Sequence, residues 1–282
     1  MGDSPTTSRP KQIVCVKWGT AYGPEYVNRL YGMVSRNITG RFRVVCLTDD
    51  ATGIRPEVAT FDLPQLGCAP PARSAGKWRK LVLWDAHLPQ LTGLVGPVLF
   101  IDLDSVIVDN IDDYFTWGSP HDVIAAQNWA KPLHRLGQTS VFRFPSGGAA
   151  VLLQAFRANP QAIADRYGFE QHYVTAMAPG GLKFWPSAWT RHFRLHCLPP
   201  WPLRYVQPAR LPSGAKIVTF PGGPNPGDVL DGRWLPTDPC GLSASEHLRR
   251  IWRHSRGPWR QSLAQMRHYV LPVPWIASAW RE

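Results

Sequence analysis

Hydrophobic residues follow two different spacings along the first hundred positions. Short runs rich in β-branched and aromatic residues are typical of buried strands. These runs occupy residues 13–18 (IVCVKW), 42–48 (FRVVCLT), 58–63 and 98–103 (VLFIDL). Between them, residues 24–34 and 78–88 carry apolar side chains at helical spacing, and Pro24 suits the first position of a helix. The order strand, helix, strand, strand, helix, strand predicts an α/β domain with a mostly parallel sheet.

The second half of the chain is less regular. Further short strands are expected at 122–126, 140–144 and 216–220, and helices at 149–158, 170–177 and 243–253. Ser243 followed by Glu246 has the spacing of a helix capping box. Because the sequence shows neither an internal repeat nor a clear linker, we expect a loose tail over 1–10, one main domain over 11–240, and a C-terminal extension over 241–282.

Composition excludes some classes of protein. The chain has 282 residues, of which 44% are hydrophobic and 18% charged, a globular balance that argues against disorder. Its five cysteines include no CxxC pair, which favours reduced, buried thiols. The N-terminus is polar, and no apolar run approaches the roughly 20 residues of a membrane-spanning helix. We therefore expect a cytoplasmic protein.

Two carboxylates follow the most apolar strand. Asp102 and Asp104 are two positions apart, so on a strand they would point to the same face, at the end where α/β sheets bind ligands. Like charges placed together favour a cation, and hard oxygen ligands suit Mg²⁺ or Mn²⁺ bound with phosphates. The alternative is that one Asp caps the next turn and the other is solvated.

Four segments, in their order, resemble a known family. They are residues 15–31 (CVKWGTAYGPEYVNRLY), 44–50 (VVCLTDD), 77–85 (KWRKLVLWD) and 98–115 (VLFIDLDSVIVDNIDDYF). Together they resemble GT-A-type glycosyltransferases, in particular the retaining family 8 group that includes glycogenin and lipopolysaccharide galactosyltransferases. The resemblance covers residues 13–228. It implies a single GT-A-type domain whose first half binds a nucleotide, and metal-dependent transfer of a hexose from a nucleotide sugar, UDP-linked in the first instance, to a hydroxyl of a glycan or glycolipid, with retention.

The resemblance also implies roles for individual residues. Asp102 and Asp104 would hold Mn²⁺ or Mg²⁺ on the donor diphosphate, and Lys80 would face the phosphates or the sugar. The other donor-binding residues would be Val16, Lys17, Trp18, Gly19 and Tyr22 at the base and ribose, Gln138, Thr139 and Ser140 beside the sugar, and Gly222 in a late loop. The alternatives are a core aromatic for Trp18 and a surface lysine for Lys80.

Glu170 and Gln171 resemble an acidic residue and glutamine that relatives carry near the anomeric carbon. Glu170 would stabilise the positive charge that develops on the sugar ring, or assist as a nucleophile, and Gln171 would position the donor. The alternative is that both form the exposed start of a helix, where a glutamate suits the helix dipole.

The late motif departs from the family pattern Phe-His-Gly-x-Pro-Lys-Pro. Residues 220–226 read FPGGPNP, so Pro221 stands where the family has a metal-binding histidine and Asn225 where it has a phosphate-binding lysine. We expect weaker metal binding with water in the vacant position, and Lys17 or Lys80 opposite the phosphates. An impaired enzyme or a different donor are the alternatives.

The C-terminal segment is basic and rich in tryptophan. The whole chain has a net charge of +11, and residues 246–282 contain seven arginines against two glutamates. Trp252, Trp259, Trp275 and Trp280 are interleaved with them. The first interpretation is a solvated basic face whose tryptophans pack on the main domain. The second is peripheral contact with an anionic membrane, on its inner surface, by an enzyme with a lipid-linked acceptor. Nucleic acid is the least favoured partner.

Two other functions compete with glycosyl transfer. A sugar-nucleotide nucleotidyltransferase shares the layout, but it would carry a glycine-rich phosphate loop after the first strand, and residues 19–23 (GTAYG) match that poorly. A non-catalytic module that binds a nucleotide sugar or nucleic acid is favoured slightly by Pro221 and Asn225.

Overall fold

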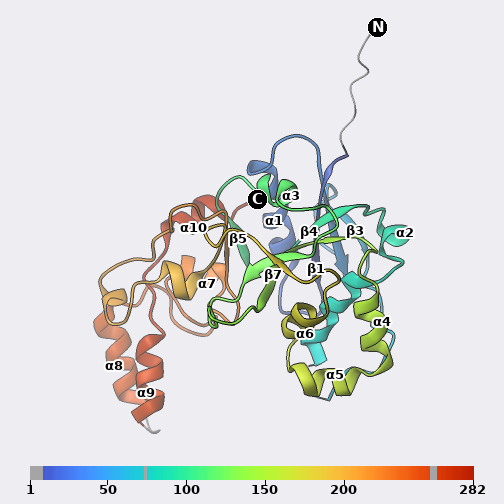
Figure 1. Cartoon of the computed structure of the whole chain (residues 1–282). Coiled ribbons are helices and arrows are strands. Elements are labelled where there is room, and N and C mark those ends of the chain that lie inside the picture. Colours follow the sequence, from blue (N-terminus) through green and yellow to red (C-terminus); the bar gives the residue numbers. More distant parts are fainter. Residues whose placement is uncertain (1–8, 73–74, 255–258) are drawn as a thin grey trace. The chain divides into compact units, whose positions relative to one another are not determined.

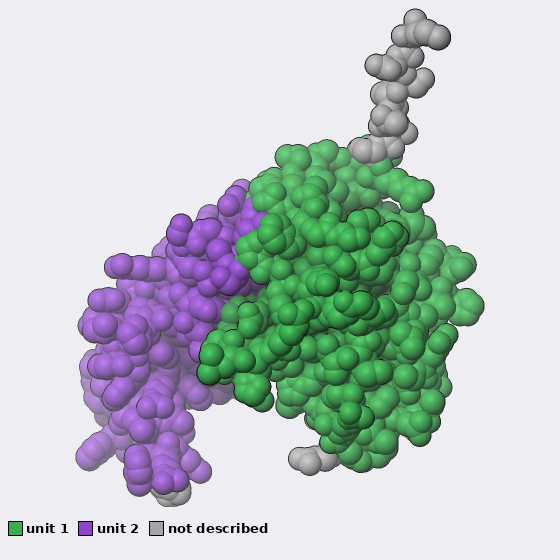
Figure 2. All heavy atoms as spheres, in the orientation of Figure 1, with its two compact units in different colours: residues 1–103, 110–186 green, residues 104–109, 187–282 purple. Residues whose placement is uncertain are grey.

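A computed structural model describes residues 9–72, 75–254 and 259–282; the tail expected over 1–10 lies outside these residues up to position 8. The chain forms two compact units, coloured separately in Figure 2. The first contains residues up to 103 and 110–186, and the second contains 104–109 and 187–282. Residues 187–240 therefore group with the C-terminal segment, whereas composition had assigned them to the main domain.

The first unit is built on a seven-stranded sheet in the order β3-β2-β1-β4-β7-β6-β8. The strands are β1 (Lys11–Lys17), β2 (Phe42–Thr48), β3 (Ala59–Asp62), β4 (Pro97–Ile101), β6 (Ile124–Gln127), β7 (Gly137–Pro145) and β8 (Lys183–Phe184). The first four in spatial order are parallel, and β7 is antiparallel to both of its neighbours. The α/β class and the mostly parallel sheet predicted from sequence are confirmed.

Helices flank this sheet, and α4, α5 and α6 lie together on one side of it in Figure 1. The helices are α1 (Pro24–Arg36), the 3₁₀ helix η1 (Ala75–Trp84), α2 (Leu88–Thr92), α3 (Asp113–Thr116), α4 (Val151–Ala158), α5 (Pro160–Tyr167) and α6 (Glu170–Met177). α1 begins at Pro24, as its sequence predicts, and buries Val27, Leu30 and Val34.

The segment expected to be one α-helix over 78–88 is instead η1, followed by a turn and the short helix α2. A 3₁₀ helix has three residues per turn, so residues three apart are in line. Trp78, Leu81 and Trp84 have that spacing and are all buried. Their rings and side chains join one core cluster: Trp78 stacks on Phe156 at 5.0 Å and Trp84 on Phe142 at 5.4 Å between ring centroids.

The second unit has a three-stranded sheet in the order β5-β10-β9. Its elements are β5 (Ser105–Ile107), β9 (Thr190–His192), the π-helix η2 (Phe193–Cys197), the 3₁₀ helix η3 (Leu203–Tyr205), β10 (Ile217–Thr219), α7 (Pro226–Leu230), α8 (Ala244–His254), α9 (Trp259–Arg267) and α10 (Pro274–Ala279). Phe193 stacks on Phe220 at 4.6 Å at the centre of this unit. Figure 1 shows α8 and α9 side by side. None of the described helices has the length and apolar character needed to cross a bilayer.

Trp84 tests the aromatic core of the first unit. It is 1% exposed, so Trp84→Ala removes a large buried side chain and should lower the free energy of unfolding by about 3–5 kcal/mol. Urea denaturation followed by circular dichroism measures the change. Trp252→Ala is the control, because that side chain is 87% exposed and its loss should leave stability within about 0.5 kcal/mol. Equal effects of the two substitutions would contradict the packing described here.

Candidate functional site

The sheet of the first unit determines where a ligand can bind. The chain leaves β1 toward β2 and β3 on one side and returns to β4 on the other, so the strand order switches direction between β1 and β4. Ligands of open α/β sheets bind beyond the carboxyl ends of the strands at such a switch point. Trp18 directly follows β1 and Asp102 directly follows β4, so both lie at this edge.

Lys80 connects three elements at this edge. Its Nζ lies 2.9 Å from each carboxylate oxygen of Asp102 and donates to the carbonyl of Thr139 at 2.9 Å. Asp102 is itself positioned by β7, because its backbone N–H donates to the Ser140 carbonyl at 2.8 Å. Lys80 is therefore a partly buried cation at this edge of the sheet, and Asp102 is an ion-paired carboxylate rather than a turn cap.

Glu170 begins α6 and is 5% exposed, which excludes the exposed helix start that sequence left open. Its Oε2 accepts a hydrogen bond from Thr139 Oγ1 at 2.7 Å, while Oε1 is buried with no hydrogen-bond partner among the described residues. Burial raises the pKa of Glu170 to about 7, against the opposing effects of Lys80 and of the Thr139 hydrogen bond, and with the Asp102 charge adding to the rise. A carboxyl group that titrates near neutrality in a polar cluster is typical of a functional site.

The other predicted residues on β7 and α6 lie close to this cluster. Gln138 and Ser140 are buried and bond to each other, Gln138 Nε2 donating to Ser140 Oγ at 2.8 Å and Ser140 N to Gln138 Oε1 at 2.7 Å. Gln171 is half-buried, and its backbone carbonyl accepts from Thr175 Oγ1 at 2.6 Å. The pair on β7 thus acts as a rigid support beside Thr139.

The residues after β1 form a second part of the same edge. Trp18 is 44% exposed, so it is not the core aromatic that sequence left open. The Arg79 guanidinium lies 5.2 Å from the centroid of the Trp18 ring, and Gly76 approaches its edge so closely that a Cβ there would lie 3.0 Å from the ring. Gly19 has a positive φ of 60° and donates its N–H to Asp49 Oδ2 at 2.9 Å.

Lys17 has a different environment from the one expected opposite the phosphates. It is 4% exposed, and its Nζ donates to the Asp50 carbonyl at 2.9 Å, which links the end of β1 to the loop after β2. Val16 and Tyr22 are half-buried, and the Tyr22 ring lies 4.8 Å from that of Tyr26. No role was expected from the sequence for Arg79, Asp49 or Asp50. The position of Asp49 and Asp50 directly after a strand could have indicated that they lie at this edge of the sheet. Nothing in the sequence indicates that Arg79 lies over Trp18.

Asp104 and Gly222 belong to the second unit. β5 pairs with β10, and Phe220 N donates to the Asp104 carbonyl at 3.2 Å, so the loop that contains Gly222 (φ 75°) starts beside Asp104. Asn225 is the N-cap residue of α7, and its N–H donates to Asp228 Oδ2 at 3.1 Å. The position where the family has a phosphate-binding lysine is therefore used here to begin a helix.

The carboxylates at this edge of the sheet are possible ligands for a divalent cation. Within the described residues, no group of three or more His, Cys, Asp and Glu side chains is placed to hold a metal. Mg²⁺, however, is usually bound through one or two carboxylates, with phosphate and water completing its shell. Asp102 is one such hard oxygen ligand, and its side chain is 28% exposed, but both of its oxygens contact the Lys80 ammonium. Asp102 could therefore contribute one ligand to a metal shell that other groups complete.

Solved structures with similar folds were found at low sequence identity. The galactosyltransferase LgtC, solved with donor and acceptor sugar analogues, matches with a TM-score of 0.53 at 12% identity, over 76% of this chain and 88% of its own. The fold of this chain is of the GT-A glycosyltransferase type. The bifunctional glycosyltransferase WbbM matches with a TM-score of 0.54 at 12% identity over 93% of this chain, which spans 52% of WbbM. The glycosyltransferase GlyE of Streptococcus pneumoniae TIGR4 matches with a TM-score of 0.52 at 12% identity, over 90% of this chain and 63% of GlyE. No protein-family model and no curated protein sequence matches the chain.

The raised pKa of Glu170 predicts a specific pH dependence of stability. The ordinary pKa is 4.5, so between about pH 4.5 and pH 7 the folded protein keeps a proton that the unfolded chain releases, and stability falls as the pH rises through this window. Over that window the free energy of unfolding of the wild type should fall by about 3 kcal/mol relative to that of Glu170→Gln. Urea denaturation of both proteins at about pH 4 and about pH 8 measures the difference. Parallel profiles would show that the carboxyl group titrates normally.

Proposed function

We propose that this chain is a glycosyltransferase that moves a hexose from a nucleotide sugar to a hydroxyl group of a glycan or glycolipid. One observation carries the proposal: a buried carboxyl group with a pKa near 7, Glu170, lies in a hydrogen-bonded chain with Thr139, Lys80 and Asp102 at the ligand-binding edge of a GT-A-type sheet. A sheet that merely bound nucleotides would not need an acid poised for ionisation in a desolvated position.

The donor would lie along the switch between β1 and β4. Trp18 offers an exposed ring to the base, Arg79 covers that ring, and Gly19 allows the backbone to turn close to the ribose. Lys80 would face the diphosphate, because its ammonium is the partly buried cation beside Asp102. A UDP-linked hexose is the donor that the family resemblance favours.

Asp102 and Asp104 would hold Mn²⁺ or Mg²⁺. Only Leu103 separates them in the sequence. When bound, the ion neutralises charge on the donor diphosphate. Pro221 offers no ligand atom, so water would complete the shell, and Lys80 adds the positive charge that Asn225 lacks.

Glu170 would act on the sugar. As the bond between the anomeric carbon and the diphosphate breaks, positive charge develops on the ring, and an ionised Glu170 stabilises it or attacks it. The acceptor hydroxyl forms the new bond to the anomeric carbon, and where Glu170 has attacked the ring, the bond from Glu170 to that carbon breaks in this step. The proton of the hydroxyl passes to a phosphate oxygen of the nucleoside diphosphate that leaves. The shared ammonium of Lys80 stabilises the leaving group, and retention of configuration is the outcome that the resemblance implies.

Exposed tryptophans of the second unit support a lipid-linked acceptor. Trp252 and Trp259 are 87% and 69% exposed beside exposed arginines of α8 and α9, whereas Trp280 is buried. Exposed tryptophan with arginine suits an anionic lipid surface, where a lipid-linked acceptor would be found. Peripheral contact of this kind is part of the proposal.

Release of nucleotide from a donor panel tests the activity. Purified protein incubated with UDP-, GDP-, dTDP- and CMP-sugars should release one nucleoside diphosphate in the presence of Mn²⁺, and EDTA should abolish the release. Asp102→Asn should reduce the rate by at least about a hundredfold, because it removes a ligand and the partner of Lys80. Asp165→Asn, at an exposed position of α5, is the matched control. Absence of both turnover and a thermal shift with every donor would refute the donor site.

The rate should also depend on the ionisation of Glu170. If the carboxylate is the active form, kcat rises with pH and levels off above about pH 7. Glu170→Gln should lower kcat by at least about a hundredfold and remove this rise, with a smaller effect on KM. A variant that keeps both the rate and the profile would show that Glu170 has no part in the chemistry.

A further inference from the structure

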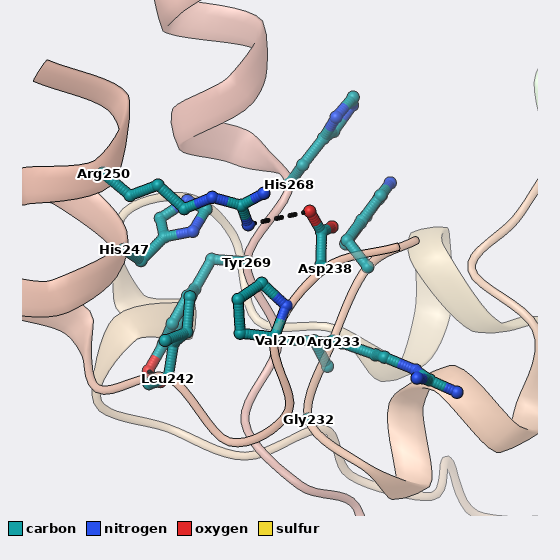
Figure 3. A pocket seen from close by; sticks show the side chains of 11 residues that line it. Gly232, Arg233, Asp238, Leu242, His247, Arg250, His268, Tyr269 and Val270 are labelled. Carbon is teal, nitrogen blue, oxygen red and sulfur yellow. Dashed lines mark hydrogen bonds and ion pairs between the residues drawn. The ribbon is translucent and has the colours of Figure 1, made fainter. Parts of the chain in front are cut away.

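The second unit contains a hollow of about 310 Å³ that the proposed transfer chemistry does not use. Its lining combines apolar and charged side chains: Leu235, Asp238, His247, Arg250, Ile251 and His268. A smaller recess adjoins it and shares four of these residues. Figure 3 shows this recess, with Arg250, His247, His268 and Asp238 gathered at it from different segments. The volume is at the lower end of the roughly 300–1,000 Å³ of ligand pockets, which suits one or two sugar rings.

α8 forms one wall of this hollow. His247, Arg250 and Ile251 are three and four residues apart, so they lie on one face of the helix. The start of α8 is held by the capping box predicted from sequence, in which Ser243 N donates to Glu246 Oε2 at 2.9 Å and Glu246 N to Ser243 Oγ at 3.3 Å. The wall is therefore anchored before any ligand arrives.

Asp238 orients the Arg250 guanidinium. Arg250 NH1 lies 3.0 Å from Asp238 Oδ1, and the second carboxylate oxygen accepts from Leu235 N at 2.9 Å. With both oxygens engaged, Asp238 acts as a fixed support, and the Arg250 side chain remains 43% exposed. A guanidinium held in this way presents a planar fork that matches a carboxylate or a phosphate.

An aromatic platform lies next to this guanidinium. The exposed His268 ring stacks on the buried Trp234 ring at 4.8 Å with 7° between the planes, and Arg194 lies 5.5 Å from the centroid of Trp234. The His247 Nε2 lies 3.2 Å from the Gln265 carbonyl, so this nitrogen carries the hydrogen. A flat, rigid face beside a fixed cation offers the two contacts that a charged sugar ring needs.

The electrostatics of this hollow favour an anion. Burial lowers the pKa of His268, and so do Arg194 and Arg204, while Asp238 raises it. Burial likewise lowers the pKa of His247, against the Gln265 carbonyl and Asp238, with Arg250 adding to the fall. Both imidazoles are thus uncharged at neutral pH, and the charged residues of the lining are Arg250 and its partner Asp238. The excess positive charge comes from Arg194 and Arg204, which do not line the hollow but lower the pKa of His268.

We propose that this hollow, between α8 and the segments around Asp238 and His268, is a binding site for an anionic sugar, a hexose ring that carries a carboxylate or a phosphate. Arg250 binds the anionic group, His268 packs against the ring, and Leu235 and Ile251 cover its apolar edge. Binding of the anionic sugar in this hollow does not require that the chain transfers a sugar from a nucleotide-sugar donor. The further assignment, that this sugar is part of the acceptor, rests on the proposed transferase function.

Titration calorimetry with the full chain tests the site. The ligands are methyl glucuronoside, glucose 6-phosphate, the neutral methyl glucoside and inorganic phosphate. We expect at least one charged sugar to bind at least about tenfold more tightly than methyl glucoside and than phosphate, and the tighter of the two identifies the anionic group. Arg250→Gln should weaken that binding by about tenfold or more, and Arg250→Lys by less, because a lysine keeps the charge and loses the fork.

Arg249→Gln is the matched control, because Arg249 is exposed on the same helix and does not line the hollow. An equal loss in Arg249→Gln and Arg250→Gln would mean diffuse attraction and would overturn the site, as would equal affinity for phosphate alone or the absence of saturable binding by either charged sugar. His268→Ala should weaken sugar binding more than Arg249→Gln does, because it removes the ring against which the sugar packs. Asp102→Asn should leave sugar binding intact, so failure of the donor-release assay together with intact sugar binding would refute the transferase and not this site.

Discussion

Burial of the central strands on both faces is the constraint on which the first unit depends. β1, β2 and β4 are apolar almost throughout, and residues such as Val14, Val45 and Phe100 belong to one core cluster. A polar side chain inside such a sheet needs a partner, because an unpartnered polar group there costs several kcal/mol. Gln12 and Arg143 are buried in this way and bond to backbone carbonyls, whereas Trp18 and Asp102 follow the strand ends.

The same cost of burial explains the arrangement of charges at that edge. Glu170 is buried, and in this position its ionised form is disfavoured, so the carboxyl group titrates near neutrality. Thr139 occupies the point between the two charges, because its hydroxyl donates to Glu170 while its carbonyl accepts from Lys80. Lys80 in turn pairs with Asp102. One ammonium group thus joins a carboxylate to the backbone of β7.

The loop after β10 in the second unit leads into a capped helix. This loop keeps glycine at Gly222 with a positive φ, but Asn225 begins α7 and engages Asp228, which in turn pairs with Arg233 at 3.1 Å. A lysine at position 225 would lack a side-chain oxygen to cap the helix. The tryptophans of this unit have different environments: Trp280 is buried, Trp234 stacks on His268, and Trp252 is exposed.

The sequence by itself determined most strands of the first unit and the helical segments α1, η1, α4, α6 and α8, because hydrophobic spacing and caps such as Ser243 and Glu246 act within a few residues. It indicated Asp102 as a carboxylate at the end of an apolar strand, and the family resemblance indicated Lys80 and Glu170. Only the tertiary structure decided what these residues contact. η1 is a 3₁₀ helix that buries Trp78, Leu81 and Trp84, and its Arg79 lies 5.2 Å from the centroid of the Trp18 ring. The ionisation of Glu170 depends on desolvation, which is a property of packing from segments distant along the chain, and local sequence carries no record of it.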